Sequence, residues 1–214
     1  ADTEDRKNAL EEFVYDTRSK LDERYSQFVQ PQEKEQLLSM LGESEDWLYT
    51  EEGEDASKSA YVSRLETLQK AAAPVHFRWK EYDERPRAAA QLREVVNRYM
   101  SVFENEPEKY DHLSDDDKMK VIEKAATVGK WLDDYMYKQS ELPKNVEPKL
   151  TSDEILKKKD DVIYVCTPIL TKPKPRVPVD TPKPEGNREG APQSEQQQQQ
   201  QGNENQKQGE MDVD

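Results

Sequence analysis

The chain has 214 residues, of which 36% are charged and 33% hydrophobic, and its net charge is −14. This excess of carboxylates repels nucleic acid phosphates and anionic membranes, so it excludes both as expected partners and favours a protein with a basic surface. The single cysteine, Cys166, excludes a disulfide framework within the chain and fits a reducing compartment.

Two helices are predicted before residue 55. Apolar or small side chains recur at three- and four-residue spacing at Leu10, Val14, Thr17, Leu21, Tyr25 and Phe28. This spacing predicts a first helix over residues 2–28. Pro31 suits the first position of a helix and predicts a second helix to about residue 50, followed by a turn at Gly53.

A third helix is predicted from about residue 56, with a kink at Pro74 because proline removes one backbone hydrogen bond. Its apolar stripe slips by about one residue after Pro86, so we expect a break near Arg85. A fourth helix then covers residues 87–104.

Two capping patterns mark the remaining helices. Ser114, followed by three aspartates, predicts a fifth helix that extends to about residue 139. Thr151 and Glu154 form a capping-box pattern for a sixth helix, which reaches about residue 169. From Lys172 onward the chain is rich in proline and glutamine and poor in apolar residues, so we expect disorder there.

Six helices without a strand pattern predict an all-α fold of two antiparallel three-helix bundles in tandem. The predicted domains are residues 1–85, residues 86–171 and the disordered tail, residues 172–214. The chain begins at Ala1, without a methionine and in what reads as a helix, so we expect a fragment.

A Trp-Leu pair occurs twice, at Trp47-Leu48 and at Trp131-Leu132. Each pair ends an amphipathic stretch, and a second helical run that meets a proline follows each of them. This order suggests one helical unit used twice. We therefore interpret Trp47, Leu48, Trp131 and Leu132 as structural anchors of the two bundles.

The sequence lacks the usual components of an enzyme site. His76 and His112 have no partner at metal-ligand spacing, Cys166 lies on the inner face of its helix, and the seven glycines form no phosphate-binding loop. We therefore predict no catalytic residues, no cofactor and no metal.

Two surface features are candidates for binding. Glu43, Glu45 and Asp46, with further acidic residues after them, surround the end of the second helix, either as a solvated face or as a docking surface for a basic partner. The segment 172–178 holds basic residues and spaced prolines, which fit either a linker or a polyproline ligand.

The sequence resembles the helical C-terminal region of the large, 110-kilodalton heat-shock proteins, a branch of the 70-kilodalton heat-shock chaperone superfamily. The residues that carry the resemblance are Lys7-Asn8-Ala9-Leu10-Glu11, Trp47-Leu48, Glu84-Arg85-Pro86 and the run from Val165 to Pro175. The resemblance extends to the acidic end, Met211-Asp212-Val213-Asp214.

The resemblance implies a non-enzymatic piece of a cochaperone whose ATP-binding domain is missing here. The whole protein would bind the ATPase domain of a 70-kilodalton chaperone, promote nucleotide exchange and hold unfolded client polypeptides. The helical arm would make one part of this grip, through Glu45 with Glu43 and Asp46 beside it.

Two features of the C-terminal end affect the expected partners and location. Met211 and Asp212 stand where the shorter chaperones have two glutamates, which puts binding of a tetratricopeptide clamp through Asp214 in doubt. The chain end lacks a retention signal for the endoplasmic reticulum, so a cytoplasmic location is expected.

The alternative function is a spectrin-like scaffolding module with a flexible tail.

Overall fold

The computed structural model describes residues 1–176, and all regular elements in this range are helices. They are α1 (Asp2–Asp22), α2 (Pro31–Leu48), α3 (Glu51–Glu54), α4 (Lys58–Asn105), α5 (Asp115–Ser140) and α6 (Ser152–Leu170). The prediction of an all-α fold is confirmed for this part of the chain. Most of the predicted disordered tail, from residue 177 onward, lies outside the described residues.

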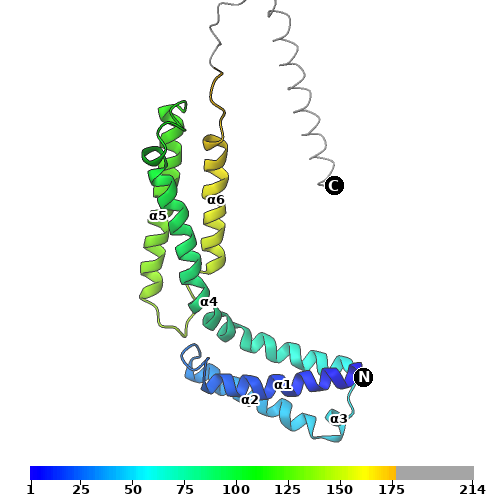
Figure 1. The fold of residues 1–214 in the computed structure, drawn as a ribbon. Helices are drawn as coiled ribbons and strands as arrows, with labels where there is room; N and C mark the ends of the chain where they lie inside the picture. Colours follow the sequence, from blue (N-terminus) through cyan, green and yellow to red (C-terminus); the bar gives the residue numbers. More distant parts are fainter. Residues whose placement is uncertain (177–214) are drawn as a thin grey trace, which may run out of the picture. The chain divides into compact units, whose positions relative to one another are not determined.

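Two groups of three helices each enclose an apolar cluster (Figure 1). The first cluster lies among α1, α2 and the N-terminal half of α4, with Leu10, Leu41 and Tyr61 almost fully buried. The second lies among the C-terminal half of α4, α5 and α6, around Leu92 and Leu132. Each such side chain contributes about 1.5–3 kcal/mol when removed from water. The predicted tandem of three-helix bundles is confirmed.

The helix break predicted near Arg85 is wrong, because α4 runs for 48 residues with Pro86 inside it. Proline in a helix interior costs about 3 kcal/mol. Buried contacts hold the helix here: Arg85 Nε donates to the Leu150 carbonyl at 2.7 Å, and Glu81 accepts from the Ser152 N–H at 2.7 Å. The slip of the apolar stripe instead marks a change of packing partners, from α1 and α2 to α5 and α6. The domain division at residues 85 and 86 stays a prediction.

Two further boundaries differ from the sequence-based expectation. α1 ends at Asp22 rather than Phe28, and the chain continues in turns. Tyr25 and Phe28 nevertheless stay buried, which explains why the helical spacing of apolar residues continues beyond the helix. The turn predicted around Gly53 contains the one-turn helix α3.

The predicted helix starts at Ser114 and Thr151 are confirmed. The Ser114 side chain accepts a hydrogen bond from the Asp117 N–H at 3.1 Å, and Thr151 accepts one from the Glu154 N–H at 3.2 Å. Each bond satisfies an N–H that has no partner inside its helix, which fixes where α5 and α6 begin.

The two Trp-Leu pairs occupy matching places in the two bundles. Leu48 and Leu132 are buried, whereas Trp47 and Trp131 are half-buried and pack at the edge of their clusters. A cation from the third helix of each bundle covers each ring. These are Arg64, 4.0 Å from the centroid of Trp47, and Lys158, 5.0 Å from that of Trp131.

Candidate partner-binding surface

The end of α2 is fixed to α3 by short polar contacts. The Thr50 hydroxyl donates to the Trp47 carbonyl at 2.6 Å and accepts from the Gly53 N–H at 3.1 Å. The Tyr61 hydroxyl, from the start of α4, donates to the Gly53 carbonyl at 2.6 Å. A Cβ at Gly53 would lie 1.8 Å from the Trp47 carbonyl oxygen, so only glycine permits this approach. The turn between α2 and α3 is therefore rigid.

The three predicted binding carboxylates lie together on the last turns of α2. Glu43 and Asp46 are exposed, stand three positions apart on one side of the helix, and make no ion pair within the described residues. Glu45 points toward α1, where it forms an ion pair with Arg18 and keeps 27% of its side chain exposed. The structure thus places two unengaged carboxylates beside one that is already paired.

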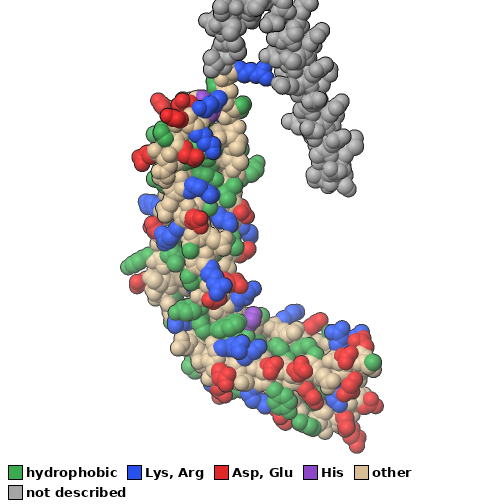
Figure 2. Space-filling model, in the orientation of Figure 1, with side chains coloured by type: hydrophobic (Ala, Val, Ile, Leu, Met, Phe, Trp, Pro, Cys, Tyr) green, Lys and Arg blue, Asp and Glu red, His purple; other side chains and the backbone are tan. Residues whose placement is uncertain are grey.

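Further acidic residues extend this surface across α3. Glu51, Glu52 and Glu54 lie within the first turn of α3, where negative charge is favourable at the positive end of the helix dipole. Figure 2 shows carboxylate side chains gathered over the end of the first bundle where α3 lies. We call the surface formed by Glu43, Glu45, Asp46 and the α3 carboxylates the acidic corner.

An aromatic pair that was not predicted from the sequence lies beside the acidic corner. Tyr15 of α1 and Tyr49, which follows α2, are 48% and 72% exposed, and their hydroxyl oxygens are 3.3 Å apart. The hydrogen bond to Tyr49 raises the pKa of Tyr15, and the nearby Glu45 charge acts in the same direction. Tyr15 stands one position away from the apolar stripe of α1, so its exposure could have been predicted from the helical spacing.

The two histidines lie apart from this surface. His76 Nδ1 and the Tyr25 hydroxyl are 2.7 Å apart, and burial, followed by the charges of Lys20 and Lys80, lowers the pKa of His76. His112 Nε2 donates to the Lys172 carbonyl at 2.7 Å. Within residues 1–176, no three His, Cys, Asp or Glu residues are grouped as metal ligands would be.

The remaining features of the sequence are placed as follows. Cys166 is fully buried in α6, and burial raises the pKa of its thiol. Lys172, at the start of the proline-rich segment, is ion-paired with Asp117 at 2.6 Å, whereas Val177 and Pro178 lie outside the described residues. None of the described helices combines the length and the apolar composition needed to cross a membrane.

Comparison with known proteins finds heat shock 70 kDa proteins as relatives of this helical chain. It is 38% identical over 188 residues to heat shock 70 kDa protein 15 of Arabidopsis thaliana, which covers 88% of this chain and 22% of that protein. It is 37% identical over 188 residues to heat shock 70 kDa protein 4L of Homo sapiens, covering 86% and 22% of the two chains. Heat shock 70 kDa protein 4 of Homo sapiens is 35% identical over 176 residues, with 81% and 21% covered.

These relatives show that the chain is homologous to part of the heat shock 70 kDa proteins of the large, 110-kilodalton branch. The resemblance drawn from the sequence motifs is therefore confirmed. The chain spans about a fifth of the length of these curated relatives. No family model matches the chain. No solved structure matches it either.

Proposed function

We propose that this chain is the non-catalytic helical arm of a cytoplasmic cochaperone. In the whole protein the arm contacts the ATPase domain of a 70-kilodalton heat-shock chaperone, and the whole protein promotes nucleotide exchange and holds unfolded clients. The names of the relatives support a chaperone role rather than the alternative, a spectrin-like scaffold. ATP binding is assigned to a domain that is not part of this chain.

The observation that carries the proposal is the rigid acidic corner. Glu43 and Asp46 are exposed and unpaired among the described residues, so a basic partner can bind them without first breaking an ion pair. The contacts of Thr50 and Tyr61 hold the corner in place, so little conformational freedom is lost on binding. Carboxylates at the edge of such an interface increase the association rate and select for a positively charged partner.

Glu45 has a different part in this proposal. Its ion pair with Arg18 offsets part of its charge and holds its side chain against α1. A basic group of the partner must therefore share Glu45 with Arg18, whereas it meets Glu43 and Asp46 alone. We assign Glu43 and Asp46 the larger share of the binding energy.

Client binding by this chain would need a continuous apolar surface. The largest exposed apolar side chains of the second bundle are Met100, Met119, Tyr137 and Tyr164. They stand on three different helices, α4, α5 and α6. The second bundle therefore gives no support for client binding by this arm alone, and we assign the holding of clients to the whole protein.

The test is the affinity of the 214-residue chain for the isolated ATPase domain of a 70-kilodalton chaperone, measured by calorimetry. The double variant Glu43→Lys/Asp46→Lys should bind about tenfold more weakly or worse, with unchanged helicity. Asp134→Lys/Glu123→Lys is the matched control, because both carboxylates are exposed on α5 of the second bundle. Equal weakening by the control pair would reject the acidic corner as the contact.

A further inference from the structure

A second candidate binding site lies where the two bundles meet. A groove of about 420 Å³ opens there between α4, the turns after α1 and the loop between α5 and α6. Its lining combines apolar and basic side chains, including Phe28, Tyr82, Arg85, Met136, Leu142 and Lys144. The lining contains three cations and no carboxylate, on a chain whose net charge is −14. Arg78 is paired with Glu33, so the positive charge of this groove comes from Arg85 and Lys144.

Arg85 is the most unusual residue of the groove. It is only 8% exposed, and its one hydrogen bond within the described residues runs from Nε to the Leu150 carbonyl. A guanidinium has five N–H donors, so the four terminal donors remain without a hydrogen bond. The terminal nitrogens are not completely buried, and Arg85 lines the groove.

Glu81, the carboxylate whose charge acts on Arg85, is already engaged in hydrogen bonds. Burial lowers the pKa of Arg85, and the charge of Glu81 opposes this effect. The two Glu81 oxygens accept hydrogen bonds from the backbone N–H and the hydroxyl of Ser152, at 2.7 and 2.6 Å. Two charge-assisted contacts therefore hold Glu81 at the start of α6. An external carboxylate can supply the hydrogen bonds that the terminal nitrogens of Arg85 lack.

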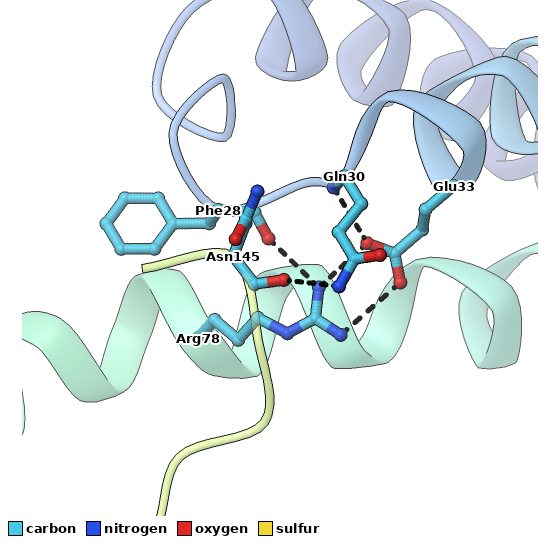
Figure 3. Close-up of polar contacts among 5 residues, drawn as sticks. All are labelled: Phe28, Gln30, Glu33, Arg78 and Asn145. Atoms are coloured by element: carbon cyan, nitrogen blue, oxygen red, sulfur yellow. Dashed lines mark hydrogen bonds and ion pairs between the residues drawn. The ribbon is translucent and has the colours of Figure 1, made fainter. Parts of the chain in front are cut away.

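Polar contacts within the first bundle, and one between the bundles, fix the walls of the groove (Figure 3). Arg78 donates to the Phe28 carbonyl at 3.0 Å and pairs with Glu33 at 2.7 Å. Gln30 donates to the Asn145 carbonyl at 3.1 Å, which ties the start of α2 to the loop between α5 and α6. A groove that is fixed before its ligand arrives loses less conformational entropy on binding.

The groove adjoins two further hollows, whose linings also include the carboxylates Asp83, Glu84 and Glu147. One of about 670 Å³ shares Phe28 and Tyr82 with it and adds the half-buried Trp79. Another, of about 370 Å³, shares Arg78 and adds the exposed ring of Phe77. Three adjoining hollows extend further than one small molecule requires, which favours an extended peptide as the occupant.

We propose that this junction groove binds an extended acidic segment of another polypeptide. One carboxylate of the segment meets the terminal nitrogens of Arg85, with Lys144 beside it. A neighbouring aliphatic or aromatic side chain packs against the Phe28–Tyr82 pair, whose ring centroids are 5.6 Å apart. The site is independent of the acidic corner, since it recognises the opposite charge.

The test uses the 214-residue chain and a fluorescent eight-residue peptide with blocked ends, in which glutamate and aspartate alternate with leucine and phenylalanine. The comparison peptide carries glutamine and asparagine in place of the acidic residues. Lys144→Glu removes a cation of the groove at an exposed position, together with its hydrogen bond to Gln27 at 3.0 Å and its contact with the Tyr82 ring, so circular dichroism and the urea midpoint must show that the fold is retained. Lys149→Glu is the matched control, because it makes the same charge change at an exposed position of the same loop outside the groove lining.

The acidic peptide should bind, as followed by fluorescence anisotropy, and Lys144→Glu should weaken its binding about tenfold or more. Lys149→Glu should change the affinity by less than about twofold. Ser140→Trp, which introduces a large ring at an exposed position of the groove without a charge change, should also block the peptide. Equal binding of the neutral peptide, equal loss in Lys149→Glu, or displacement by succinate as effective as by unlabelled peptide would each overturn the proposal.

Discussion

Glu81 in the middle of α4 and Ser152 at the start of α6 are joined by two buried hydrogen bonds, of 2.7 Å to the Ser152 N–H and 2.6 Å to its hydroxyl. The two residues are 71 positions apart in the chain. Glu81 therefore fixes the first residue of α6 against the long helix, close to the point where α4 leaves the first bundle.

Loss of this carboxylate should destabilise the chain markedly. Glu81→Ala removes both hydrogen bonds and leaves the buried Arg85 without its nearest negative charge, so we expect a loss of roughly 3 kcal/mol in the free energy of unfolding. Urea unfolding followed by circular dichroism measures this value. Glu84→Ala is the control, because its pair with Lys80 is solvent-exposed and should cost less than about 1 kcal/mol. Similar losses in the two variants would show that the buried contact of Glu81 with Ser152 does not stabilise the junction between the two bundles.

Two glycines of the same bundle should respond to alanine in opposite directions. Gly53→Ala brings a Cβ to 1.8 Å from the Trp47 carbonyl oxygen, so the corner must shift, and we expect a destabilisation of roughly 1–3 kcal/mol. Gly42 lies within α2 with open space around its Cβ position, so Gly42→Ala should stabilise by about 0.5–1 kcal/mol. Thermal unfolding of both variants decides the question, and a stable Gly53→Ala chain would show that the corner is not rigid.

His76 should make stability depend on pH. Burial lowers its pKa in the folded chain below the ordinary value of 6.5, so the unfolded chain binds the proton more readily. The stabilisation is fully present above pH 6.5 and is lost as pH falls through the lowered folded pKa. In His76→Gln, the urea concentration at the unfolding midpoint should therefore change less between about pH 7.5 and pH 5 than it does in the parent chain. The same slope in both chains would assign the pH dependence to other groups.

The ion pair between Arg18 and Glu45 should limit partner binding more than it supports the fold. Arg18→Ala should cost less than about 1 kcal/mol of stability, because the pair is partly exposed. It also frees Glu45 and should strengthen binding of the chaperone ATPase domain about twofold to fivefold. Lys34→Ala is the control, since it removes an equal charge from α2 by breaking the pair with Asp22. Weaker binding by Arg18→Ala would show that Arg18 itself contacts the partner.

Local signals in the sequence were enough to predict much of the fold. Hydroxyl side chains at Ser114 and Thr151 cap α5 and α6 as expected, because capping depends on residues only three positions apart. The spacing of buried side chains such as Leu10 and Leu132 also follows from the helical repeat.

The continuity of α4 could not be predicted in the same way. Glu81 and Arg85 read as ordinary surface charges in the sequence, yet both are buried, because their partners Ser152 and Leu150 approach from another helix pair. The junction groove depends on the same distant contacts. The acidic residues of the corner were visible as a cluster, but the engagement of Glu45 by Arg18 required the packing of α1 on α2.

The most direct test of the proposed function is the rate of ADP release from a 70-kilodalton chaperone, driven by the full-length protein that contains this arm. Glu43→Lys/Asp46→Lys in the arm should slow the stimulated release about tenfold, while Asp134→Lys/Glu123→Lys should leave it unchanged. Release at the unaltered rate by the acidic-corner variant, with its helices intact, would contradict the account.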